Sequence, residues 1–229
     1  MDVYTETGTR RVFAGAIEWP GWCRSGRSED EALQALVGSA ARYARAVAGA
    51  GTGPRFRQPR SVADLHLVDR LGGSATTDFG APGAAPASDL RDLDVADLAR
   101  LKAILSSCWA AMDRAAHAAQ GRTLAKGPRG GGRSLEAIIR HVTEAEASYV
   151  ARLGIARPKI GTSDAGAAAV AVEVHRVIDD ALSRAVRDGL PARGPRGGAI
   201  WTPRYLARRM AWHALDHAWE IEDRAGLGP

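Results

Sequence analysis

Apolar residues recur at helical spacing through the C-terminal part of the chain and predict four helices there. Each segment carries apolar residues three and four positions apart, the pattern of a helix with one face in a core. The last segment places Pro203 at its first position, where proline favours a helix start. Four amphipathic helices of similar length predict a four-helix bundle. The expected helices span about 89–120, 134–152, 164–188 and 203–225.

The N-terminal part has the shorter patterns of a small α/β unit. The segments VYTET and RVFAGAIEW are rich in β-forming residues and predict two strands, and SVADLHLVDRL predicts a third. Between them a helix is expected over about 29–48, because Ser28 and Glu31 form a capping-box pattern before its apolar positions. The fold class expected for the whole chain is therefore α+β.

A stretch rich in Gly, Pro and Ala separates these two patterns. Such a composition is typical of a connection between domains. We therefore expect an α/β domain over 1–75, a linker over 76–88 and a helical domain over 89–229. A length of 229 residues is enough for two small domains of this kind.

Composition and charge limit the classes of partner. No run reaches the roughly 18 to 20 apolar residues of a membrane span, and the N-terminus lacks a signal-peptide layout, so we expect a cytoplasmic protein with no membrane partner. The two cysteines, Cys23 and Cys108, are far apart and indicate no disulfide framework. The net charge of +5 is carried mostly by Arg, in a composition rich in Ala and Gly that is typical of a GC-rich genome. Residues 1–88 are nearly neutral, which argues against nucleic acid as a partner.

Two histidines interrupt the apolar stripe of the last predicted helix. In RRMAWHALDHAWEIEDR, His213 and His217 stand one turn apart on the stripe that Met210 and Ile221 continue. Two imidazoles one turn apart on a buried face can share a metal ion, since neutral imidazole is a good ligand and desolvation opposes its protonation. The alternative is a pair of core histidines that bond to the backbone or to a carboxylate.

His141 is the natural third ligand. It flanks the apolar stripe of the second helix, beside Ile138 and Ala145, and can turn toward a neighbouring helix. Its depth in that helix matches the depth of the pair better if the second and fourth helices are antiparallel. That arrangement requires the second and third helices to run in the same direction.

Two carboxylates and two arginines complete the candidate site. Glu220 is a candidate general base or fourth ligand, and Asp216 is a candidate partner that orients an imidazole. The equally weighted alternative is that both are ordinary carboxylates, solvated or ion-paired. Arg129 and Arg133 lie in KGPRGGGR, just before the second helix, where a helix N-terminus and arginine charge favour an anion such as a substrate carboxylate or phosphate. The alternative is that this stretch, like the similar RGPRGGAIW before the fourth helix, is a solvated linker.

The helical part resembles the DinB/YfiT-like superfamily of metal-binding four-helix bundles. The matching residues are His141 in LEAIIRHVTEAEASYV and the pair His213 and His217 in WHALDHAWEIEDR, and the likeness spans about 89–229. The resemblance implies a divalent metal, zinc first with nickel or iron as alternatives, held by these three histidines. It also implies a low-molecular-weight thiol as co-substrate in several members, often mycothiol in actinobacteria.

The N-terminal part resembles the HicB-like fold through FAGAIEWPGWCRSGRSEDEAL, residues 13–33. HicB proteins are antitoxins, but no helix-turn-helix or ribbon-helix-helix segment follows here. We expect this part to cover the pocket or to mediate a homodimer. The expectation for the chain is a metal-dependent transferase or isomerase that uses a mycothiol-like thiol on a small, anionic metabolite. The alternatives are a thiol-independent lyase, hydrolase or cyclase, and a HicB-like nucleic-acid-binding regulator.

Overall fold

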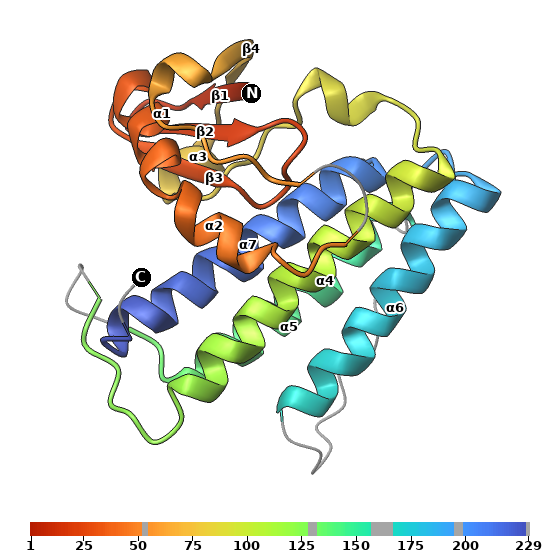
Figure 1. The fold of residues 1–229 in the computed structure, drawn as a ribbon. Coiled ribbons are helices and arrows are strands. Elements are labelled where there is room, and N and C mark those ends of the chain that lie inside the picture. Colours follow the sequence, from red (N-terminus) through yellow and green to blue (C-terminus); the bar gives the residue numbers. More distant parts are fainter. Residues whose placement is uncertain (52–54, 128–131, 157–166, 195–198, 228–229) are drawn as a thin grey trace.

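The structure is a computed structural model that describes residues 1–229 except 52–54, 128–131, 157–166, 195–198 and 228–229. It is a mixed α/β protein in which a four-stranded N-terminal sheet is followed by a helical C-terminal part (Figure 1). In the described ranges no helix combines the length and the apolar character needed to cross a membrane. The fold class expected from the sequence is confirmed at this level.

The sheet has the strand order β3-β2-β1-β4. Neighbouring strands β1, β2 and β3 pair antiparallel, whereas β4 runs parallel to β1. Strands β1, β2 and β4 correspond to the three predicted segments. Strand β3 was not predicted, because its four residues CRSG lack the alternation that marks a strand. The strands are β1 (Asp2–Thr7), β2 (Val12–Ala16), β3 (Cys23–Gly26) and β4 (His66–Gly72).

The helix predicted over 29–48 is divided at Ser39. It forms α1 (Glu29–Gly38) and α2 (Ala40–Ala46), so the prediction of one continuous helix was wrong. The Ser39 hydroxyl donates to the carbonyl of Leu36 at 2.8 Å and accepts from the indole of Trp22 at 3.0 Å. A serine that bonds to nearby backbone in this way competes with helical hydrogen bonding.

The segment 76–88, predicted as a linker, is packed against the sheet. It overlaps the short helix α3 (Ala75–Phe79) and a single helical turn at Ala87–Leu90. The fully buried carboxylate of Glu6, on β1, accepts backbone N–H groups from Gly83 at 2.9 Å and Ala84 at 3.0 Å. These bonds fix the connection in place against β1.

The four helices predicted for the C-terminal part are all present. The first begins at Val95 and not near 89, because Asp94 caps it by accepting the N–H of Asp97 at 2.7 Å. The third is described from Ala167, and its predicted start at 164–166 lies outside the described residues. The helices are α4 (Val95–Ala118), α5 (Leu135–Val150), α6 (Ala167–Asp188) and α7 (Pro203–Arg224).

Hydrogen bonds between the helices show their directions. Arg224, at the end of α7, donates to the carbonyl of Arg133 just before α5 at 2.9 Å, so α5 and α7 are antiparallel, the arrangement that matches the depths of the histidines better. On α6, Asp179 bonds to Lys102 at 2.9 Å and His175 stacks on Trp109, so α6 is antiparallel to α4.

The sheet packs directly on α7, which lies beneath it in Figure 1. The buried guanidinium of Arg208 donates to the carbonyls of Ala16 at 2.5 Å and Ile17 at 2.7 Å, at the end of β2. Its ε-nitrogen also donates to Asp89 at 2.6 Å. One continuous hydrophobic core includes residues of both parts. Helix α7 is therefore held on one side by the sheet and on the other by the remaining helices.

Candidate metal centre

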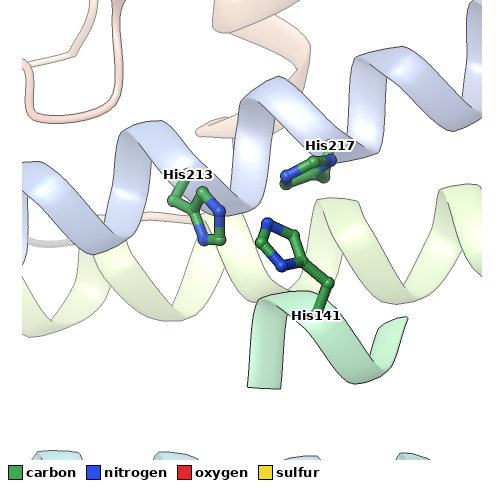
Figure 2. Close-up of side chains that lie close together, drawn as sticks. All are labelled: His141, His213 and His217. Atoms are coloured by element: carbon green, nitrogen blue, oxygen red, sulfur yellow. The ribbon is translucent and has the colours of Figure 1, made fainter. Parts of the chain in front are cut away.

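Three imidazoles meet between α5 and α7. His141 projects from α5, while His213 and His217 project from successive turns of α7, and Figure 2 shows their rings facing one another. The ring centroids are 5.1 Å apart for His141 and His213, 5.0 Å for His141 and His217, and 4.7 Å for the α7 pair. One nitrogen from each ring lies within 4.8 Å of the other two. The structure thus brings together the three histidines singled out in the sequence.

Helix geometry explains this arrangement. Residues four apart on a helix lie on the same face, about one turn of 5.4 Å from each other. The start of α7 is fixed by Thr202, whose hydroxyl accepts the N–H of Tyr205 at 3.2 Å. Because α5 runs antiparallel beside it, His141 comes opposite the middle of α7 and faces both members of the pair.

Burial keeps two of the imidazoles in the form that binds metals. The pKa of His213, which is only 5% exposed, is lowered well below its usual value, first by burial and then by the neighbouring His217 and His141. The pKa of His141 is also lowered, with burial again the main cause. Metal ions bind the neutral imidazole. Both side chains are therefore ready ligands near neutral pH without losing a proton.

A hydrogen-bond chain orients the third imidazole. Nδ1 of His217 lies 2.7 Å from Oε2 of Glu220, and Oε1 of Glu220 accepts from Arg224 at 2.7 Å. The pKa of Glu220 is lowered to about 2, mainly by the bond to His217, so the carboxylate is ionised. An ionised carboxylate only accepts, so Nδ1 of His217 carries the hydrogen, and Nε2 is the ring nitrogen left for a metal.

The three imidazoles fit a divalent cation. In a tetrahedral zinc site with Zn–N distances of about 2.1 Å, ligand nitrogens lie about 3.4 Å apart, so modest side-chain rotations would bring these rings into place. Nδ1 of His213 is buried without a hydrogen-bond partner among the described residues, which a structural core histidine would need. The unpartnered nitrogen and the oriented His217 are both what a metal site requires.

The two candidate carboxylates have different partners. Glu220 orients an imidazole, the role expected for Asp216, and both of its oxygens are engaged by His217 and Arg224. Asp216 instead lies 3.4 Å from Arg24 of β3 and is 41% exposed. In the described part of the chain it makes no hydrogen bond to an imidazole. Because Asp216 precedes His217 by one residue, it is rotated by about 100° around the helix, away from the cluster.

Of the two arginines predicted to form an anion site, the structure describes only Arg133. Arg129 lies outside the described residues. Arg133 is exposed just before α5, and its charge contributes to the lowered pKa of both His141 and His213. The positive charge of Arg133 therefore lies near the cluster, beside Arg224 at the C-terminal end of α7.

Three residues beside the cluster were not predicted from the sequence to belong to the site. The ring of Tyr149 lies 5.8 Å from that of His213, and the guanidinium of Arg209 lies 4.8 Å above Trp212. Arg224 holds Glu220 in place. Helical spacing was the available signal, since Arg209 precedes His213 by four residues and Arg224 follows Glu220 by four.

Comparisons of this chain with protein-family models, with curated proteins and with solved structures found no match.

Proposed function

We propose that this protein is a metal-dependent enzyme whose cation is held by His141, His213 and His217. The observation that supports the proposal is the convergence of one nitrogen from each imidazole to within 4.8 Å, from two separate helices. Imidazole ligands suit zinc, nickel or iron better than magnesium or calcium, with zinc the first choice. Three protein ligands are typical of catalytic sites, which keep a position open, and not of closed structural zinc sites.

A divalent cation at this position would lower the pKa of a bound water or thiol and polarise a substrate carbonyl. The residues of the chain prepare the site for that chemistry. Burial keeps His213 and His141 neutral, and Glu220 fixes the ring of His217. Arg224 holds Glu220 while donating to the carbonyls of Ala125 and Arg133.

The resemblance to the DinB/YfiT-like superfamily extends the proposal to a reaction class. It supports a transferase or isomerase that uses a small thiol, of the mycothiol type, on a small metabolite. The N-terminal part, which resembles the HicB-like fold, serves in this proposal as a cover that holds α7 through Arg208. A thiol is a natural co-substrate for such a site, since a cation stabilises thiolate at neutral pH.

Metal analysis tests the first part of the proposal. Purified wild-type protein, incubated with zinc and then dialysed, should retain about one zinc per chain by elemental analysis. The variants His213→Ala and His217→Ala should each lose most of it, because two imidazoles hold zinc far more weakly than three. His117→Ala, at an exposed position on α4, is the matched control and should retain zinc. Wild-type protein that retains no zinc, nickel or iron would overturn the proposal.

Thiol binding tests the second part. Zinc-loaded protein should unfold at a higher temperature in the presence of mycothiol, glutathione or cysteine, because a ligand that binds only the folded state stabilises it. The shift should be absent from zinc-free protein and from His213→Ala. If zinc binds stoichiometrically and none of these thiols shifts the unfolding temperature, the thiol is excluded and a thiol-independent lyase, hydrolase or cyclase is favoured.

A further inference from the structure

A buried arginine lies beside the three histidines without a counter-ion. Arg209, on α7, is only 9% exposed and precedes His213 by one turn. One of its terminal nitrogens donates to the carbonyl of Pro82, and the other lies 3.5 Å from the hydroxyl of Tyr149. Neither partner is a carboxylate. Across the described ranges, no carboxylate comes within ion-pair distance of this guanidinium.

The neighbouring Arg208 on the same helix is also buried, but it has a structural role with a carboxylate partner. Arg208 is equally buried, but its guanidinium forms a two-pronged bond with the carboxylate of Asp89, at 2.6 and 2.8 Å. A buried charge is costly unless a counter-charge and hydrogen bonds compensate it. Within the part of the chain that the structure describes, the charge of Arg209 is compensated only by a carbonyl, a phenol and the faces of two aromatic rings. The structure therefore keeps a buried positive charge available at this position.

Contacts place this charge at the edge of the histidine cluster. The guanidinium lies 4.8 Å from the ring of Trp212 and 5.6 Å from the ring of Tyr149. The Tyr149 ring in turn lies 5.8 Å from the ring of His213. Arg209 and Tyr149 thus lie together on the side of the cluster toward the start of α7, whereas the exposed Arg133 lies toward the opposite end of that helix.

We propose that Arg209, together with the hydroxyl of Tyr149, binds an oxyanion group, a carboxylate or a phosphate, of the substrate that reacts at the histidine cluster. This inference rests on the proposed function and narrows its substrate class to small organic acids or phosphate esters. A guanidinium offers five N–H groups in a planar fork, and the contacts to Pro82 and Tyr149 leave donors for an oxyanion. The phenol hydroxyl supplies a further donor beside them. An acid group held by Arg209 and Tyr149 leaves the rest of the substrate directed toward the three imidazoles.

Burial distinguishes this site from the exposed arginine of the glycine-rich segment. An exposed guanidinium attracts anions through solvent and is screened by salt, whereas a guanidinium shielded from water interacts much more strongly. The exposed Arg133 attracts anions only through solvent, and Arg209 provides the specific contact. The two residues can therefore be separated by mutation.

Anion titrations test the assignment with a signal that does not require turnover. Zinc-loaded and zinc-free wild-type proteins are titrated with succinate, benzoate and inorganic phosphate, followed by calorimetry and by tryptophan fluorescence, to which Trp212 contributes. We expect saturable binding of at least one of these probes. Arg209→Gln should weaken it at least tenfold, and Tyr149→Phe several-fold. Arg140→Gln, at an exposed position on α5, is the matched control and should bind like the wild type.

The variants also guard against a folding defect. Tyr149→Phe leaves the bond between Arg209 and Pro82 intact, and the unfolding temperature and zinc content of every variant are measured alongside. Wild-type affinity in a folded Arg209→Gln variant overturns the inference, as does a loss of binding in Arg133→Gln alone. If the wild-type protein holds zinc but binds none of these anions, the inference is overturned and the proposed function stands. Anion binding that depends on Arg209 in a protein that never binds metal supports the anion site and refutes the proposed function. Preference for succinate or benzoate over phosphate assigns the group as a carboxylate.

Discussion

Nδ1 of His217 lies 2.7 Å from Oε2 of Glu220, three residues later on α7. The carboxylate is itself held by Arg224, which donates to its other oxygen at 2.7 Å. This chain fixes the tautomer and the orientation of one imidazole of the cluster. A carboxylate behind a ligating imidazole also raises the basicity of the ring, which strengthens its bond to a metal.

Removal of the Glu220 carboxylate should weaken metal binding without abolishing it. We expect Glu220→Ala to lower zinc affinity by about 10- to 100-fold, the usual cost of losing such an orienting partner. Glu220→Gln should fall between this variant and the wild type, since an amide oxygen still accepts from Nδ1 but carries no charge. Competition with a chromophoric zinc chelator gives the affinities.

Glu144→Ala is the matched control for that experiment. Glu144 lies on α5 three residues after His141 and is exposed, so its removal should leave zinc affinity within about twofold of the wild type. An unchanged affinity in Glu220→Ala would show that the ring of His217 is held by its packing alone. The hydrogen bond would then have no part in metal binding.

The stability of the zinc-free protein should fall on mild acidification. The pKa of His213 lies well below its usual 6.5, so below pH 6.5 the unfolded chain takes up a proton that the folded chain does not. The free energy of unfolding should therefore fall as pH decreases from about 7 to 5, by at most about 1.4 kcal/mol per pH unit for this histidine. Urea unfolding at several pH values measures the slope. His213→Gln should reduce this slope, and the part that remains belongs to His141, whose pKa is also lowered.

A second, separate loss is expected at lower pH. Glu220 titrates at about 2 in the folded protein and at its usual 4.5 in the unfolded chain. Its contribution to stability is present above pH 4.5 and is lost as pH falls toward 2. A slope between pH 7 and 5 that is as steep in His213→Gln as in the wild type would contradict the assignment to that histidine.

Periodicity predicted the long helices well but missed features that depend on single hydrogen bonds. The four helices of the C-terminal part each show one apolar face, so their existence could be read from the sequence. The break at Ser39 could not be read in this way, because it depends on the bonds of that serine to Leu36 and Trp22. Strand β3 forms because it pairs with β2. This pairing cannot be predicted from the pattern of a segment of only four residues.

The histidine cluster was predictable because its signal is local. His213 and His217 mark one face of α7, and His141 marks the adjoining face of α5. The partners of the carboxylates were not predictable, since Asp216 turns to Arg24, a residue almost two hundred positions earlier in the chain. Arg209 was missed for a related reason. Its spacing of four residues before His213 was visible, but the sequence does not show that the adjacent Arg208 bonds to Asp89, more than one hundred positions away.

Glu146 should be important for stability and not for metal binding. This fully buried carboxylate on α5 accepts from the indole of Trp109 at 2.8 Å and lies 3.0 Å from Nε2 of His175, so it joins three helices. We expect Glu146→Ala to lower the free energy of unfolding by about 3 kcal/mol, because Trp109 loses its acceptor and His175 loses its polar partner. Urea unfolding measures the loss, and zinc content should be unchanged. Exposed Glu144→Ala should change stability by less than about 0.5 kcal/mol.

Asp89 should hold the sheet to the helices through Arg208. Asp89 is 1% exposed and bonds to Arg208, which also donates to two carbonyls at the end of β2. Asp89→Ala leaves a buried guanidinium without its counter-charge and should cost about 3–5 kcal/mol. In the double variant Asp89→Ala with Arg208→Met, part of this loss should be recovered, since no buried charge remains. Urea unfolding of the two single variants and the double variant measures the coupling. Fully additive losses would show that Arg208 stabilises the contact through its carbonyl bonds alone.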